Sequence, residues 1–310
     1  MTRIAAIDIG TNTILMLIAD AEQGTIRSIV RDEHAIARLG KGVDANRVIL
    51  PETFRRTEDY LRTYINLAIS FKCDYIRSCG TSALRDAANR DDFVAHIRSA
   101  LGIDIEILTK EEEALMTYRG GISGLSSLDE EKKYAVIDIG GGSTEIALGA
   151  GSRVLDHCSL DIGSVRLTER FLQHSPPLAN ALEEARAFVR TALDAVPPVP
   201  AETEFIGVAG TLTTLAALDL QLQHYQRDRV DGHRLNYSTV SQSFEYLRGL
   251  TLRQLKAIPQ ILPERADILV AGILILREIL DHYKQQTILV SDRGLRYGIL
   301  LREAARLAAS

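Results

Sequence analysis

Two segments of the sequence are repeated at a single displacement of 130 residues. Ile7-Asp8-Ile9-Gly10 recurs as Ile137-Asp138-Ile139-Gly140, and Gly80-Thr81 recurs as Gly210-Thr211, so the displacements (138 − 8 and 210 − 80) agree. One short match can arise by chance, but two separate matches at one displacement indicate a duplicated domain. The sequence therefore predicts two related lobes.

Each half of the chain alternates strand-like and helical segments. Residues 51–71 begin with a proline and carry apolar residues at helical spacing, and residues 178–196 form an amphipathic helical pattern. Residues 24–40 have the character of strands, and residues 153–171 pass from strand into helix. This alternation predicts an α/β fold with layered lobes.

Glycine, serine and charged residues cluster between the two halves, over residues 120–133. Such clusters mark connections between periodic segments. We therefore predict a first lobe over residues 1–124 and a second over residues 125–310. The end of the chain has a helical pattern, and its residues 295–310 are a candidate to pack back on the first lobe.

The size and composition limit the class of protein. With 310 residues, of which 46% are hydrophobic, the chain can bury the cores of two domains. Its longest apolar run, residues 268–276, is much shorter than the roughly 18 residues that a membrane span needs. Because no secretion signal is evident at the N-terminus, we expect a cytoplasmic protein that does not bind membranes.

Cysteine usage and charge exclude further classes of site. The cysteines are three in number and show no C-x-x-C spacing, which argues against a disulfide framework and against a zinc site. The net charge is −5 and no block of lysine or arginine occurs, so we expect no nucleic-acid partner. An anionic substrate stays open, because a few arginines and backbone amides can bind phosphate locally.

Small residues follow the repeated aspartate in both halves. Their backbone amides can approach an anion closely, and their hydroxyl groups add donors. Neither a Walker loop nor a dinucleotide-binding fingerprint is present, and a tight hairpin turn is the simpler alternative for one such segment. We predict phosphate binding by Gly10, Thr11, Asn12 and Thr13 in the first half and by Gly141, Gly142, Ser143 and Thr144 in the second.

The repeated aspartates, Asp8 and Asp138, lie within otherwise apolar strand-like segments. A carboxylate in such surroundings carries a desolvation penalty unless it meets a cation or hydrogen-bond donors. We therefore expect both side chains to face a cleft between the lobes that holds a metal ion or water.

The motifs resemble those of the exopolyphosphatase and guanosine pentaphosphate phosphohydrolase (Ppx/GppA) family of the actin-like superfamily. They occur in the family's order over nearly the whole chain, and they include AAIDIGTNTILMLIA, SCGTSALRDAAN, ILTKEEEALMTYRGG, VIDIGGGSTEIALG, SLDIGSVRLTERF, GVAGTLTTLAAL, LPERADILVAG and VSDRGLRYGIL. The resemblance implies two ribonuclease H-like (actin-like) lobes with a phosphate-binding cleft between them. Longer members of the family carry a C-terminal helical domain that this sequence does not contain.

The resemblance also implies the catalytic residues. The family's base, a glutamate that activates water, matches Glu113, with the alternative that Glu111, Glu112 and Glu113 are only an acidic first turn of a helix. Two acidic residues of the family's mechanism match Asp138 and Glu145. These two suit Mg²⁺ or another divalent cation, and Asp8 is expected to bind the metal or orient water as their counterpart in the first lobe.

Two arginines are the predicted contacts of substrate phosphate, because a guanidinium group can satisfy two oxygen atoms at once. Arg85 is the first, with an ion pair to Asp86 or Asp92 as its alternative role. Arg265 matches a family arginine, with packing at a helix start as its alternative.

The expected activity is release of terminal orthophosphate from inorganic polyphosphate by water attack, with Glu113 as the base. Hydrolysis of the 5′ γ-phosphate of guanosine pentaphosphate is the first alternative, since both substrates end in the same anhydride. A kinase of the same superfamily is less favoured, because kinases use an aspartate to deprotonate an acceptor hydroxyl. A phosphate sensor or assembly protein would bind without turnover. A homodimer is the expected oligomer.

Overall fold

The computed structural model describes residues 1–125 and 127–309, and the chain divides into two compact units. Unit 1 comprises Met1–Gly120 and Leu295–Ser310, and unit 2 comprises Gly121–Gly294. The predicted boundary at residue 124 lies close to the first division, whereas the predicted second lobe ran on to residue 310. Residues 126 and 310, which fall within that predicted lobe, lie outside the described residues.

The described residues of unit 1 form a five-stranded sheet with the strand order β3-β2-β1-β4-β5. The central strand β1 is antiparallel to β2 and parallel to β4. From Ile4 to Ile9 its residues are buried on both faces of the sheet, and all of them except Asp8 are apolar. The strands are β1 (Thr2–Ile9), β2 (Ile14–Glu22), β3 (Thr25–Ala35), β4 (Tyr75–Gly80) and β5 (Ile105–Ile107).

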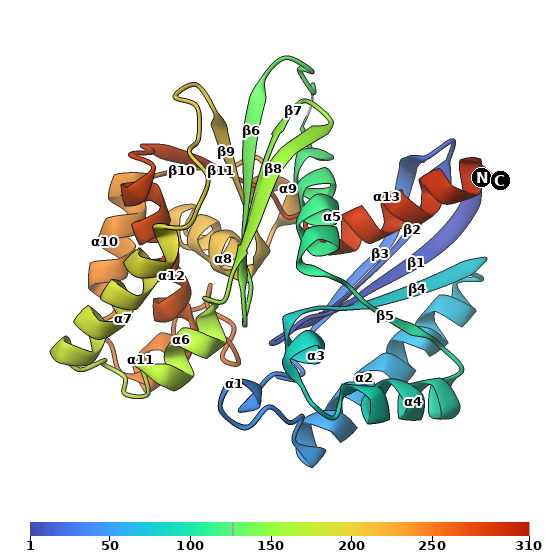
Figure 1. The fold of residues 1–310 in the computed structure, drawn as a ribbon, viewed down its shortest axis with the longest axis horizontal. Coiled ribbons are helices and arrows are strands. Elements are labelled where there is room, and N and C mark those ends of the chain that lie inside the picture. Colours follow the sequence, from blue (N-terminus) through green and yellow to red (C-terminus); the bar gives the residue numbers. More distant parts are fainter. Residues whose placement is uncertain (126, 310) are drawn as a thin grey trace. The chain divides into compact units, whose positions relative to one another are not determined.

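Two hydrophobic cores cover the two faces of this sheet. One contains Ile7 and Ile9 with side chains of α2 and α4, and the other contains Ala6 with Tyr297 and other side chains of α13. Figure 1 shows α13 lying along β1–β3 within this unit. The helices are α1 (Val43–Asn46), α2 (Pro51–Ser70), α3 (Ser82–Asp86), α4 (Arg90–Leu101), α5 (Lys110–Ile122, whose last residues belong to unit 2) and α13 (Leu295–Ala308).

Helices α5 and α13 approach each other closely at Gly298. A Cβ atom added there would lie 2.0 Å from the backbone oxygen of Met116, and backbone cannot move aside as a flexible side chain can. We expect Gly298→Ala to lower the free energy of unfolding by roughly 1–3 kcal/mol, as overpacking does elsewhere. Urea unfolding measures this; the control is Gly249→Ala, whose Cβ would meet its nearest atom at an ordinary 3.5 Å. Equal stabilities of the two variants would contradict the close contact.

Unit 2 repeats the strand arrangement of unit 1. Its described residues form a six-stranded sheet with the order β10-β11-β9-β6-β7-β8, in which β6 is antiparallel to β7 and parallel to β9. The run β8-β7-β6-β9 thus matches β3-β2-β1-β4. The strands are β6 (Lys133–Ile139), β7 (Thr144–Ala150), β8 (Arg153–Leu160), β9 (Glu204–Val208), β10 (Arg234–Asn236) and β11 (Thr287–Val290).

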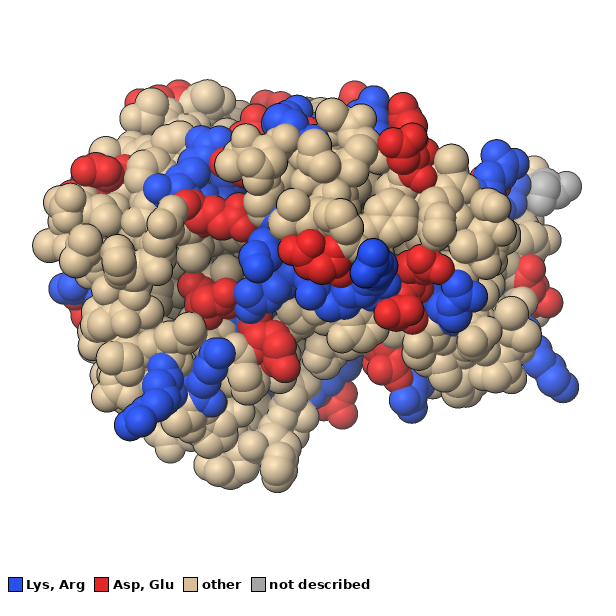
Figure 2. Space-filling view, turned by 90° about the horizontal axis from the view of Figure 1, so that it is seen from below, with Lys and Arg blue, Asp and Glu red and all other residues tan. Residues whose placement is uncertain are grey.

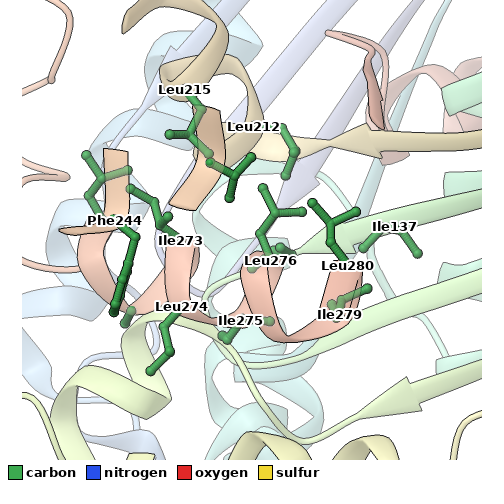
Figure 3. Close-up of a cluster of buried hydrophobic side chains, with 14 of the residues drawn as sticks. Ile137, Leu212, Leu215, Phe244, Ile273, Leu274, Ile275, Leu276, Ile279 and Leu280 are labelled. Carbon is green, nitrogen blue, oxygen red and sulfur yellow. The ribbon is translucent and has the colours of Figure 1, made fainter. Parts of the chain in front are cut away.

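Helix α12 (Leu269–His282) forms the centre of the unit 2 core. It is buried on every side from Leu269 to Leu280, and Figure 3 shows its side chains among residues of β6, α8 and α10. Its buried residues are apolar except for Arg277 and Glu278, which pair with each other, and a helix with so much apolar surface is stable inside a core. The other helices are α6 (Ser164–Arg170), α7 (Ala179–Leu193), α8 (Ala209–Asp219), α9 (Arg227–Val230), α10 (Tyr237–Leu247) and α11 (Leu252–Lys256).

The α/β fold with two lobes is confirmed, as are the predicted helices at residues 51–71 and 178–196. Residues 153–171 pass from β8 into α6, as the sequence predicts. None of the helices in the described part of the chain combines the length and apolarity that a bilayer crossing requires.

Candidate active site

A tight turn joins β6 to β7 in unit 2 and holds most of the phosphate-binding residues predicted there. The N–H of Gly140 donates to the carbonyl oxygen of Ser143 at 3.0 Å, which closes the turn. Thr144 follows it as the first residue of β7 and is fully buried, and its hydroxyl donates to the Ile162 carbonyl at 2.7 Å. The Thr144 hydroxyl therefore helps to hold the turn in place, and phosphate binding by Thr144 stays a prediction.

The segment Gly163–Arg166 binds the carbonyl side of this turn, and we call it the α6 clamp. The Gly140 carbonyl accepts the N–H of Ser164 at 2.9 Å, and the Gly141 carbonyl accepts the N–H of Val165 at 2.9 Å. The approach is so close that a Cβ atom at Gly163 would lie 2.4 Å from the Gly141 oxygen. Because C=O and N–H point in opposite directions in a trans peptide, the amides that follow these carbonyls face away from the clamp.

Unit 1 contains the equivalent turn between β1 and β2. The N–H of Gly10 donates to the Thr13 carbonyl at 3.0 Å, the same bond as in unit 2 at the displacement of 130 residues. The Thr11 carbonyl accepts the N–H of Gly40 at 2.8 Å, and the Asn12 carbonyl accepts the N–H of Arg38 at 2.9 Å. Both turns thus have their carbonyls held from one side, which suits backbone amides for an anion on the other.

Asp138 and Glu145 are direct cross-strand partners on β6 and β7. Such partners have Cβ atoms about 4.5–5.5 Å apart and lie on one face of the sheet. Glu145 is buried, and its carboxylate accepts the hydroxyl of Ser159 on β8 at 2.8 Å. Burial and the Glu145 charge raise the pKa of Asp138 to about 7.

This carboxylate pair fits a divalent cation. Two like charges held together in a buried place repel each other, and a hard cation with oxygen ligands relieves that repulsion. Within the described residues, no group of three or more His, Cys, Asp or Glu side chains is arranged to hold a metal. Mg²⁺ is typically bound by one or two carboxylates, with water and substrate phosphate oxygens completing its shell.

Unit 1 lacks the second carboxylate at the equivalent register position. Asp8 is the cross-strand partner of Leu15, where unit 2 has Asp138 opposite Glu145. On its other side Asp8 neighbours Cys79 of β4, a buried thiol whose pKa is raised to about 12, chiefly by burial. The structure therefore gives the predicted metal ligands of the two units unequal surroundings.

Glu113 and Arg85 form a buried ion pair in unit 1. Arg85 Nη1 lies 2.5 Å from Glu113 Oε2 and also donates to the Leu108 carbonyl at 3.0 Å. The other terminal nitrogen of Arg85 is buried and has no hydrogen-bond partner in the part of the chain that the structure describes. The predicted base and one predicted phosphate ligand are thus in direct contact.

The neighbours of this pair have other roles. Glu112 accepts the N–H of Thr109 at 2.9 Å and its hydroxyl at 3.0 Å, a contact typical of the first turn of a helix. Asp86, proposed from sequence as an alternative partner of Arg85, forms an ion pair with Arg47 at 3.6 Å.

Arg265 contacts the second copy of the Gly-Thr repeat in unit 2. A Cβ atom at Gly210 would lie 1.9 Å from the Arg265 Nη1 atom, so the guanidinium group lies directly against the first turn of α8. The preceding residue, Ala209, has φ of 71°, a value uncommon for a residue other than glycine. The structure thus joins two motifs that are distant in sequence.

Lysine and arginine do not form a uniform basic surface on the face drawn in Figure 2, where acidic side chains lie among them. This face therefore presents no broad positive field to an anion. Sequence reasoning assigned no role to Arg166, Gly163 or Ser159. The only signal was that SLDIGSVRLTERF belongs to the motif set, since their contacts depend on strand register and on the position of α6.

Comparisons with known proteins confirm the family predicted from the motifs. Exopolyphosphatase 2 of Mycobacterium tuberculosis is 37% identical over 316 aligned residues, which cover 97% of this chain and 98% of that protein. A crystal structure of the Aquifex aeolicus Ppx/GppA family member matches with a TM-score of 0.83 at 30% identity, covering 99% of this chain and 98% of that one. The crystal structure of an exopolyphosphatase-like protein matches with a TM-score of 0.93, the same identity and the same coverage.

The model of the Ppx/GppA phosphatase family matches residues 17–307. That range includes the second glycine-rich turn, the Asp138–Glu145 pair and the Arg85–Glu113 pair. The chain therefore belongs to the Ppx/GppA phosphatase family.

Proposed function

We propose that the protein is an exopolyphosphatase that releases terminal orthophosphate from inorganic polyphosphate with the help of a divalent cation, Mg²⁺ being the favoured ion. The observation that carries the proposal is the cross-strand pair Asp138–Glu145 next to the glycine-rich turn. A cation ligand set beside backbone amides suits a phosphoanhydride, whose hydrolysis requires charge neutralisation and positioning. The exopolyphosphatase relatives, similar along nearly the whole chain, support this substrate class.

Each group has a defined chemical task in this proposal. Asp138 and Glu145 hold the cation, which when bound neutralises charge on phosphoryl oxygens. Amides of the second turn bind the phosphate oxygens. Glu113 accepts a proton from water as the water oxygen bonds to the terminal phosphorus. The bond from that phosphorus to the bridging oxygen breaks, and the remaining chain leaves with the bridging oxygen.

In this proposal the two terminal nitrogens of Arg85 have different roles. Nη1 holds Glu113 in place through the ion pair, while the second terminal nitrogen is available to a phosphate oxygen. Such bidentate use is a property of the guanidinium fork that lysine does not share. Arg265 and the first turn stay predicted phosphate ligands, and Asp8 a predicted metal ligand. The cytoplasmic location and the homodimer likewise stay predictions.

Phosphate release tests the proposal directly. Polyphosphate of defined length and guanosine pentaphosphate are each supplied with Mg²⁺ and, separately, with chelator. We expect release from polyphosphate that depends on the cation and a higher kcat/KM for it than for guanosine pentaphosphate. The reverse preference would support the guanosine pentaphosphate activity, and phosphate transfer that requires an added sugar would identify a kinase.

A further inference from the structure

Each glycine-rich turn has a carbonyl group at the same position of the repeat, and the two carbonyls accept hydrogen bonds from donors of different charge. In unit 1 the Asn12 carbonyl accepts the neutral main-chain N–H of Arg38 at 2.9 Å. In unit 2 the equivalent carbonyl, at Gly142 (142 − 12 = 130), accepts the side-chain Nε of Arg166 at 2.7 Å. The donor to this carbonyl is therefore a neutral main-chain N–H in unit 1 and a charged guanidinium group in unit 2. Unit 2 is also the unit that contains the Asp138–Glu145 pair.

Arg166 is buried, with 7% of its surface exposed, and both its main chain and its side chain donate hydrogen bonds to the turn. Its main-chain N–H donates to the Gly141 carbonyl at 3.1 Å, while its side chain reaches Gly142. Burying a guanidinium group costs free energy that a main-chain donor does not require. Unit 1 satisfies the same carbonyl with a neutral donor, so the charge of the donor is a feature that only the turn of unit 2 has.

We propose that Arg166 is a positioning residue that strengthens phosphate binding by the second turn, acting through the peptide group between Gly142 and Ser143. The carbonyl of that group accepts the charged donor, and its N–H, on Ser143, points the opposite way. A charge-assisted bond polarises the peptide group, which makes the N–H a stronger donor to an anion. This inference rests on the proposed function, in which the second turn binds polyphosphate.

Binding of polyphosphate to variants in a Glu113→Gln parent tests the inference without turnover. The variants are Arg166→Gln and Arg166→Lys. The matched control is Arg277→Gln in the same unit, which removes an arginine of 8% exposure that pairs with Glu245 and Glu278 in the helical layer. Calorimetry with a polyphosphate of defined length gives Kd, and a thermal melt of each variant gives Tm.

We expect Arg166→Gln to raise Kd by about 5–10-fold, because the Ser143 N–H still meets the phosphate but loses the polarisation that the charged donor provides. Arg166→Lys should fall between this variant and the parent, because it keeps the charge but not the guanidinium geometry. Arg277→Gln should lower Tm and leave Kd within about threefold of the parent. With Glu113 intact, Arg166→Gln should raise KM more than it lowers kcat, because the lost binding is common to ground and transition states.

The outcomes separate this inference from the function on which it rests. A parent that does not bind polyphosphate removes the proposed function, and the inference with it. A parent that binds, together with an Arg166→Gln variant of equal Kd, overturns the inference alone, as does an equal loss of affinity in Arg277→Gln. If Arg166→Gln does not fold, the folded Arg166→Lys variant decides: weakened binding supports the inference, and parental binding overturns it.

Discussion

Replacing Glu113 by glutamine is expected to lower kcat for polyphosphate hydrolysis by about 10²–10⁴-fold, the usual contribution of a general base. Glutamine has the shape of glutamate and can still accept the Arg85 donor through its amide oxygen, but it cannot take a proton from water. Because the loss lies in the proton transfer rather than in binding, KM should change little. Phosphate release at saturating polyphosphate and Mg²⁺ measures the effect.

Glu112→Gln is the matched control for this experiment. Glu112 precedes Glu113 on α5, and its carboxylate contacts only the start of its own helix among the hydrogen bonds described for it, at Thr109. We expect Glu112→Gln to keep kcat within about threefold of the wild type, since the amide oxygen of glutamine can still accept the Thr109 donors. A Glu113→Gln enzyme that matches this control would exclude Glu113 as the base.

The internal repeat made the fold predictable to a large extent. An apolar strand, a small-residue turn and a second strand at one displacement predict two copies of the same hairpin, and the structure shows the same closing bond at Gly10 and at Gly140. The central strands could be predicted from local sequence, because burial on both faces demands apolar residues at nearly every position, with Asp8 and Asp138 as the exceptions. The sequence of α13 does not by itself determine that the helix lies in unit 1. Its location depends on packing against β1 and β2, which are far from it in the sequence.

The sequence predicted which residues belong to the candidate site, but it did not predict which of them contact each other. Glu113 and Arg85 were each predicted for a reason of their own, yet their ion pair depends on how α3 and α5 meet, which neither local sequence specifies. The difference between Leu15 and Glu145 is visible in the sequence, but it becomes meaningful only once the strand register makes each the direct partner of an aspartate. Strand register sets which side chains share a face.

Asp138→Asn is expected to change stability and activity in opposite directions. In protein treated with chelator, burial and Glu145 raise the pKa of Asp138 from 3.8 to about 7. A carboxyl group whose pKa is raised by folding binds more protons in the folded state, so its contribution to stability is present below about pH 4 and is lost as the pH rises to about 7. At pH 8 the ionised Asp138 therefore destabilises the cation-free fold, and the asparagine variant lacks this charge.

We expect cation-free Asp138→Asn to melt at least about 2–4 °C above the wild type at pH 8, equivalent to about 1 kcal/mol, and to lose that advantage near pH 4. Mg²⁺ should raise the Tm of the wild type but not of the variant, while kcat/KM of the variant falls by about 10³-fold because the cation is lost. Asp156→Asn is the matched control, because Asp156 is exposed on β8 of the same unit and has no part in the proposed site. Its carboxylate accepts the main-chain N–H of His157 at 2.8 Å, so the Mg²⁺ shift in Tm should be retained. A control that gains the same stability and loses the same Mg²⁺ shift would show that neither effect belongs to the carboxylate pair.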